Sequence, residues 1–294
     1  VTSNERMTDR APGSAAPVDD GRHDVDPTRA PLPWHVVETL PQADEESIRR
    51  WDDAVARARE QGDAHAVARA SIGAALTRYW GHQLLGRGAS WHDVATERTR
   101  LVDEATTIAR SATITDSTTI TDAGSHDLLV EALLGRLYAC WGPGRAERSA
   151  ALGELLALSD DTTRADLRLR VDEFEVLDRF DRGDLPGAAR LVDAFERRHG
   201  TGPEQELARR RTALWRSNLA MLEGRLDDAV ELNERAVSNT AELAGSPAAF
   251  QNVAVTRSIE RYLRGGLGDV IEAVRSIRAS AVSVGANWDV ALAF

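Results

Sequence analysis

The sequence contains no lysine, so all 36 basic residues are arginine, against 47 aspartate and glutamate residues. Without lysine the chain cannot carry a P-loop lysine, a Schiff-base lysine or a serine–lysine nucleophile pair. The net charge of −11 also argues against nucleic-acid binding, which depends mainly on a surplus of cationic side chains. We therefore expect neither a standard P-loop ATPase nor a direct nucleic-acid binder.

Cysteine and long apolar runs are also scarce. Cys140 is the single cysteine, which excludes an intrachain disulfide and any multi-cysteine metal site, and its apolar neighbours predict a buried, inert thiol. No apolar run approaches the roughly 18 residues of a membrane-spanning helix, and the N-terminal residues lack the layout of a signal peptide. We therefore expect a cytoplasmic protein that does not enter a membrane.

The sequence has few of the patterns that carry catalysis. Its seven histidines are scattered, without the His-x-x-x-His or His-Glu-x-x-His spacing that places two metal ligands on one helix face. The Gly-x-Ser-x-Gly nucleophile motif is absent. We therefore expect a non-enzymatic protein without a metal or a cofactor, and an enzyme with a diffuse site is kept as an alternative.

Proline is concentrated at the N-terminal end of the sequence. Six of the ten prolines fall within the first 41 residues, among Gly, Ser, Asp and Arg and with almost no periodic apolar residues. A segment of this composition cannot bury enough apolar surface to fold alone. We expect residues 1–42 to form a disordered leader and residues 43–294 to form the folded domain.

From about residue 44 onward, apolar residues recur with the period of a helix. In the segments 185–195 and 267–281 they stand at i, i+3, i+4 and i+7, which lines one helix face, and no convincing alternating strand is present. A tract at 113–122, in which Thr-Ile-Thr-Asp is nearly duplicated, interrupts this pattern. We expect an inserted loop near 112–125, with Ser125 or Asp127 capping the next helix.

An internal repeat of 41 residues predicts the fold. Shifted by 41 residues, Gly183–Ala188 falls on Gly224–Ala229, and a second shift falls on Gly265–Val270. The pattern Gly-x-Leu-x-x-(Ala/Val) therefore occurs three times at one spacing. The same register aligns Phe174 with Trp215 upstream of the glycines.

Each repeat unit is predicted to contain a longer helix A, a glycine turn and a helix B, with the glycine in the left-handed conformation that ends many helices. The register also aligns Phe180 with Met221 and Tyr262 on successive A helices. The expected helices are 44–60, 65–85, 90–111, 127–141, 145–158, 163–182, 186–199, 204–223, 226–243, 247–264, 268–283 and 286–294. We expect an all-α fold, an α-α superhelix in the form of a tetratricopeptide-like (TPR-like) α-solenoid.

The motifs at Gly183–Ala188 and Gly224–Leu232, with the segment Trp141–Arg148, carry a family resemblance. They resemble the tetratricopeptide-like repeats in the C-terminal part of large actinobacterial transcriptional regulators and signal-transduction ATPases, including LuxR-type regulators. The resemblance covers roughly residues 64–294 and implies a role in transcriptional regulation or signalling. In such proteins a nucleotide-binding domain precedes the repeats. Because lysine is absent, this chain lacks a standard P-loop. As one alternative, the resemblance implies the repeat arm of a nucleotide-dependent regulator whose ATPase and DNA-binding domains lie outside this chain.

A run of arginines marks the candidate partner-binding site. Arg209, Arg210, Arg211 and Arg216 lie on the predicted A helix that also carries Trp215. A helices commonly line the concave surface of a solenoid, and arginine suits bidentate contacts with carboxylate or phosphate groups. These five residues are our predicted site.

The same arginines have a purely structural interpretation, which we keep open. They can pair within the chain, with Glu204, Glu206 or Glu223 on the same helix or with Asp178 on the neighbouring A helix. The repeat register also makes Trp215 core-facing, so this side chain can belong to the core instead of the site.

The function that we expect is a sensor or interaction module that binds a protein or peptide on its concave face. The alternative is a sensor whose small-molecule effector occupies a cavity around Tyr138, Trp141 and Trp215. The last residues, 286–294, begin like another A helix and then stop. We therefore also expect a truncated array that self-associates through its C-terminal end.

Overall fold

The computed structural model describes residues 45–80, 91–115, 123–140, 146–162, 164–202, 204–238, 256–266, 268, 270–272 and 275. Within these residues the chain is helical and contains no strand, which confirms the expected all-α class. The helices are α1 (Glu45–Gln61), α2 (Ala64–Trp80), α3 (Trp91–Thr115), α4 (Ala123–Ala139), α5 (Ala146–Leu158), α6 (Ala165–Asp181), α7 (Leu185–His199), α8 (Gln205–Leu222) and α9 (Leu226–Ser238). A further helix spans 256–263.

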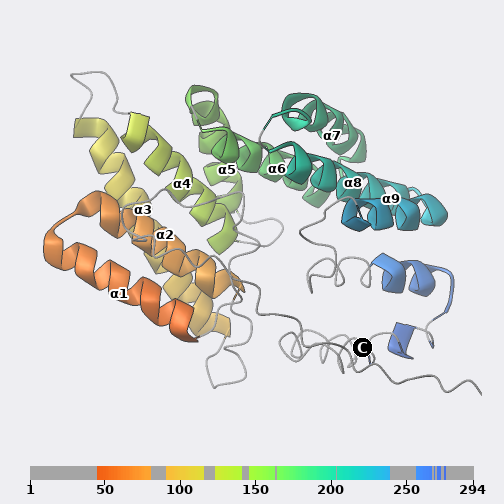
Figure 1. Ribbon diagram of the computed structural model, residues 1–294, viewed down its shortest axis with the longest axis horizontal. Coiled ribbons are helices and arrows are strands. Elements are labelled where there is room, and N and C mark those ends of the chain that lie inside the picture. The colour runs from red at the N-terminus through yellow and green to blue at the C-terminus, as the bar shows by residue number, and fades with distance from the viewer. Residues whose placement is uncertain are drawn as a thin grey trace, which may run out of the picture.

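The helices follow one another across the molecule in chain order (Figure 1). Each helix from α1 to α9 packs against its neighbours in sequence, and α2 also packs against α4, and α4 against α6. The even-numbered helices α2, α4 and α6 therefore form a continuous row, which corresponds to the A helices of the repeat. This arrangement is consistent with the predicted helical-repeat fold.

Two apolar cores meet at α6. The first core joins α2, α3, α4, α5 and α6 and includes Leu167 and Phe174. The second core joins α6, α7 and α8 and includes Val176, Phe195 and Trp215. Helix α6 is therefore buried on two faces, and its sequence has apolar residues on both of them.

Glycines end the repeated helices in the predicted way. Gly183, Gly224 and Gly265 have φ angles of 70°, 77° and 84°, in the left-handed region that glycine adopts without strain. After α6, the Gly183 N–H donates to the carbonyl of Phe180 and the Asp184 N–H donates to that of Arg179, each at 2.9 Å. Equivalent pairs of bonds follow the other two glycines. These are Schellman caps, so the predicted glycine turn is confirmed at all three positions.

At two of the glycine turns, an aspartate side chain also caps the helix that follows. The Asp184 side chain accepts a hydrogen bond from the Gly187 N–H at 2.9 Å and so caps the start of α7. The turn between α1 and α2 is built in the same way, because Gly62 has a φ of 67° and the Asp63 side chain accepts from the Ala66 N–H at 3.0 Å. The 41-residue register had not included this turn.

Some expected boundaries were wrong. Helix α3 continues to Thr115, and α4 already begins at Ala123, so half of the expected loop near 112–125 is helical, and the other half, 116–122, lies outside the described residues. Ser125 is consequently buried inside α4 and does not precede it as a cap. The predicted leader 1–42 and the C-terminal segment 286–294 also lie outside the described residues.

Two glycines test the packing of the helix pairs. A Cβ on Gly73, within α2, would lie 2.4 Å from the Trp51 ring, which packs against the first core, whereas a Cβ on Gly153, within α5, would meet nothing within 4 Å. We expect Gly73→Ala to lower the free energy of unfolding by about 1–3 kcal/mol, because the ring must leave its place. Gly153→Ala should raise it by about 0.5–1 kcal/mol, because only helix propensity changes. Urea unfolding measures both, and a stabilised Gly73→Ala would contradict the packing of Trp51.

Candidate functional site

The predicted site residues lie on α8, but they point to different surroundings. Trp215 is buried, 5% exposed, and its ring meets that of Phe195 edge to face, with centroids 4.9 Å apart. This tryptophan belongs to the second core, in agreement with the structural interpretation from the repeat register. Arg209 is exposed on the other side of the helix.

Arg216 pairs with the neighbouring helix α7. Its Nη2 atom lies 2.9 Å from an oxygen of Asp193 and 2.6 Å from an oxygen of Glu196. The pairing partners suggested from the sequence were therefore wrong for this residue. Glu223 and Asp178 instead pair locally, with Arg225 and Arg182. Arg216 thus ties α8 to α7, and its prediction as a partner-binding residue stays a prediction.

Arg210 and Arg211 face a buried carboxylate on α6. The Nε atom of Arg211 donates to Glu173 Oε1 at 2.8 Å, and Arg170 Nη1 donates to Glu173 Oε2 at 2.6 Å. Arg210 also acts on Glu173 electrostatically. Glu173 is 4% exposed and Arg170 is fully buried. We call Arg170, Arg210, Arg211 and Glu173 the arginine cluster; it joins α6 to α8 and continues the row of A helices.

Burial and the attraction of nearby carboxylates act against each other in the arginine cluster. Burial lowers the pKa of Arg211 to about 10 and also lowers the pKa of Arg210, against the attraction of Glu173 and Glu206. It raises the pKa of Glu173, although Arg170 acts in the opposite direction. The exposed Glu206 and the half-buried Glu204 face solvent, which screens their charges. Burial acts to lower the pKa of Arg170, but the attraction of Glu173 and Glu204 outweighs it and raises this pKa.

A second polar cluster adjoins it on α6 and α7. Asp172 accepts hydrogen bonds from Arg198 Nη1 and shares one with His199 Nε2, both at 2.7 Å. Burial acts to raise the pKa of Asp172, but the bonds with His199 and Arg198 outweigh it and hold this pKa below its ordinary value. The His199 ring also lies 4.8 Å from that of Phe195. These contacts hold the end of α7 against α6.

Glu131 on α4 is the third buried carboxylate of the row. It is 1% exposed and forms an ion pair with Arg164, the residue before α6. Burial raises its pKa to about 7, against the attraction of Arg164 and of Arg69 on α2. Asp166 of α6 also contributes to the raised value. A carboxyl group that changes charge near neutral pH therefore lies where α2, α4 and α6 meet.

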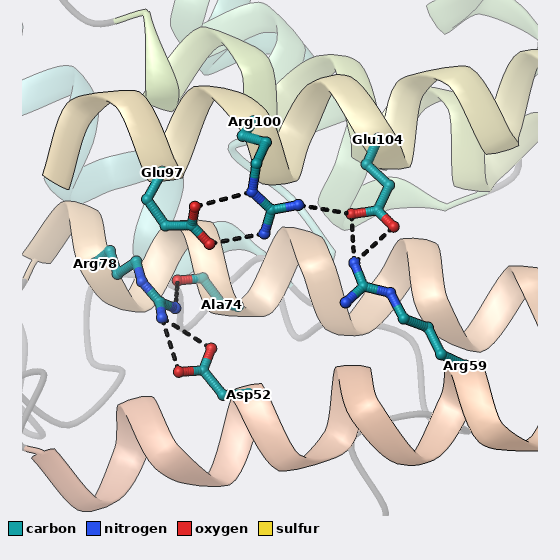
Figure 2. Close-up of polar contacts among 7 residues, drawn as sticks. All are labelled: Asp52, Arg59, Ala74, Arg78, Glu97, Arg100 and Glu104. Atoms are coloured by element: carbon teal, nitrogen blue, oxygen red, sulfur yellow. Dashed lines mark hydrogen bonds and ion pairs between the residues drawn. The ribbon is translucent and has the colours of Figure 1, made fainter. Parts of the chain in front are cut away.

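The first three helices carry a network of ion pairs at the surface (Figure 2). Arg100 on α3 bonds to Glu97 at 2.7 and 2.8 Å and to Glu104 at 3.3 Å, and Glu104 also accepts from Arg59 of α1 at 2.7 Å. The hydrogen bond from Arg100 holds the pKa of Glu97 below its ordinary value. Each carboxylate in this network has an arginine beside it. The network therefore joins helices, and its surface is not dominated by charge of one sign. Exposed pairs of this kind add little stability individually.

Large apolar side chains are exposed near the C-terminal end of the described residues. Among the residues that the structure describes, the exposed large apolar side chains are Leu222, Ile259, Tyr262, Leu263 and Ile271, with exposures of 61%, 43%, 62%, 53% and 38%. We call these five residues the apolar end surface. Beside it, a cleft of about 250 Å³ lies between α9 and helix 256–263, lined by Asp227, Val230, Glu231, Glu234, Arg257, Glu260 and Arg261.

Two of the residues named for the expected effector cavity, Tyr138 and Trp215, lie in different cores. Tyr138 packs in the first core, with its ring 5.0 Å from Phe174, whereas Trp215 packs in the second core. Trp141 lies outside the described residues. Cys140 is buried, as expected.

Sequence reasoning identified the α8 arginines of the arginine cluster but missed Arg170, Glu173 and Glu131. A signal was present, because Arg170 stands between Leu169 and Val171 in a stretch that the helical pattern makes buried on two faces. A charged residue in such a position needs a buried partner. The identity of that partner, however, depends on how α6 and α8 are placed.

Two comparisons with known proteins found no match. No family model matches the chain, and no curated protein matches it. No group of three or more His, Cys, Asp or Glu residues is placed to hold a metal ion in the described part of the chain. Of the helices described, none is both long and apolar enough to cross a membrane.

Proposed function

We propose that the chain is a non-enzymatic helical-repeat module that binds a protein partner through the face of its A helices. The observation that carries this proposal is the apolar end surface. Large exposed apolar side chains that gather in one place mark sites of protein interaction in otherwise polar surfaces. The family resemblance of the repeats suggests a further step, that the module is the sensor or interaction arm of a regulatory system.

The repeat register places two of the exposed residues, Leu222 and Leu263, on corresponding positions of successive A helices. Leu222 ends α8 and Leu263 ends helix 256–263, 41 residues later. An ion pair between Asp227 at the start of α9 and Arg264, at 2.5 Å, holds the ends of these two repeat units together. The two leucines therefore belong to neighbouring repeats at the same end of the array, where one partner can contact both.

Corresponding positions upstream are better covered. Phe180, which aligns with Tyr262, is partly buried against the second core, whereas Tyr262 is 62% exposed. Leu177, which aligns with Ile259, packs against the first core, whereas Ile259 is 43% exposed. The helix 256–263 therefore has the apolar residues of an A helix, but here these residues are exposed.

Affinity capture with matched variants tests the proposal. The tagged chain and its Tyr262→Ser/Leu263→Ser variant would be used as baits in extracts of the source cells. We expect the variant to capture about tenfold less of its partner, or less still, because removal of two central apolar contacts costs more than about 1.4 kcal/mol of binding free energy. Quantitative mass spectrometry of the captured proteins measures the loss.

The control variant is Asp53→Ser/Arg57→Ser, which changes two exposed residues at the opposite end of the array, on α1. It should capture the same partner as the unchanged chain. If every captured protein is retained equally by both double variants, the apolar end surface is not a binding face and the proposal fails. Circular dichroism spectra of the three baits check that all are equally folded.

A further inference from the structure

Two stripes of opposite charge border the cleft between α9 and the helix 256–263, which lie beside each other (Figure 1). Each stripe has three residues at i, i+4 and i+7, a spacing that places them on one face of a helix. The acidic stripe on α9 and the basic stripe on or directly after the helix 256–263 are Asp227, Glu231 and Glu234, and Arg257, Arg261 and Arg264.

The stripes pair with each other at both ends of the cleft. Arg257 forms an ion pair with Glu234. Arg264 lies 2.5 Å from Asp227 and also pairs with Glu260 of its own helix. The two helices are therefore joined by ion pairs on either side of the middle of the cleft.

The middle residues of the stripes do not pair with each other. Glu231 forms an ion pair with Arg235, on its own helix. In the part of the chain that the structure describes, Arg261 forms no ion pair, although it lines the cleft together with Glu231. One carboxylate and one guanidinium group therefore line a cleft of about 250 Å³ without a partner across it.

We propose that a second copy of the chain binds at this end of the array, related by a two-fold axis that brings Arg261 of each copy to Glu231 of the other. In such an isologous contact, residue i meets residue j and residue j meets residue i. The two middle residues of each cleft are thereby paired twice. This inference rests on the proposed function, because it names the partner of the apolar end surface.

The apolar side chains of the same helix favour contact between like ends. Ile259, Tyr262 and Leu263 lie on the helix that carries the basic stripe, and all three are exposed. Within the described residues, large exposed apolar side chains belong to the apolar end surface alone. A second copy can therefore match this surface with its own C-terminal end, whereas a head-to-tail contact would place it against polar side chains.

The charge around the cleft is balanced, although the chain carries a net charge of −11. Four carboxylates line the cleft, and four arginines either line it or pair with these carboxylates. They are Asp227, Glu231, Glu234 and Glu260, and Arg235, Arg257, Arg261 and Arg264. Because copies of an acidic chain repel one another, a neutral surface is where two copies approach with least repulsion.

A mixture of two charge-reversed variants tests the proposal. In Arg261→Glu the contact has two carboxylates from each copy, and in Glu231→Arg it has two arginines, so like charges meet twice in each homodimer. We expect each variant to dimerise about tenfold or more weakly than the unchanged chain, because like charges placed opposite each other are repulsive. The two variants should bind each other as tightly as two unchanged chains do, because opposite charges then meet at both points. Sedimentation velocity with one variant fluorescently labelled measures the dissociation constants.

The control variants make the same changes of charge elsewhere. Arg190→Glu on α7 and Glu60→Arg on α1 alter exposed residues, and each should dimerise like the unchanged chain. Tyr262→Ser changes no charge and should weaken the dimer, because it removes an exposed aromatic side chain from the contact. Circular dichroism spectra check that all variants are folded.

The proposal is overturned if the unchanged chain dimerises with a dissociation constant above about 1 mM, or if Arg261→Glu and Glu231→Arg bind each other no better than each binds itself. Should either charge variant not fold, Tyr262→Ser decides, and an unweakened dimer overturns the proposal. A monomeric chain whose capture of another protein depends on Tyr262 and Leu263 would refute the second copy and leave the proposed function intact. A dimer restored in the mixture, with every other protein captured equally by both double variants, would refute the binding of other proteins and leave the dimer intact.

Discussion

Replacing Phe174 by alanine should lower the free energy of unfolding by about 3–5 kcal/mol, the range for removal of a buried phenylalanine. Phe174 is 2% exposed in the first core, and its ring meets Tyr138 of α4 edge to face, with centroids 5.0 Å apart. The substitution leaves a cavity at the contact of α4 with α6. Because a repeat array is stabilised by contacts between neighbours, the loss weakens the junction between its two halves.

Urea unfolding followed by circular dichroism measures this loss, and Leu222→Ala is the matched control. Leu222 is also an A-helix residue, but it is 61% exposed, so its truncation should change stability by less than about 0.5 kcal/mol. Equal effects of the two substitutions would mean that α6 is not the shared helix of the two cores. A broadened transition in Phe174→Ala alone would indicate that the halves then unfold separately.

The second large effect concerns pH. Burial raises the pKa of Glu131 from its ordinary value of 4.5 to about 7. The folded protein therefore binds more protons than the unfolded chain between these two pH values, and the free energy of unfolding contributed by this group falls as pH rises through that window. Over the whole window the contribution amounts to about 3.5 kcal/mol, at about 1.4 kcal/mol per pKa unit.

Glu131→Gln removes this dependence, because glutamine resembles the protonated carboxyl group. At pH 5 the variant and the unchanged chain should have similar stability, whereas at pH 8 the variant should be the more stable of the two. Glu60→Gln, at an exposed position near the end of α1, should shift stability equally at both pH values. If Glu131→Gln is instead less stable at pH 8 than at pH 5 relative to the unchanged chain, the ion pair with Arg164 outweighs the cost of burial.

Both predictions depend on contacts of α6 with α4. Some features of this chain could be predicted from the sequence, and others could not. The helical period, the repeated glycines and the core position of Trp215 follow from local rules, and the structure agrees with them. The end of α3 was misplaced because its Thr- and Ile-rich tract has weak helix propensity, whereas the helix continues to Thr115. Ser125 was misassigned as a cap because α4 already begins at Ala123.

The sequence by itself determined the helices, their turns and the order of stacking, because each of these depends on residues within one repeat or in its neighbour. A left-handed glycine and the aspartate that follows it set the turn between α6 and α7 without help from distant parts of the chain. Only the tertiary structure decided which charges meet. Glu173 and Arg211 are 38 positions apart, and Glu131 and Arg164 are 33 positions apart. Their pairing depends on the placement of whole helices across the row, which residue spacing along one helix does not specify.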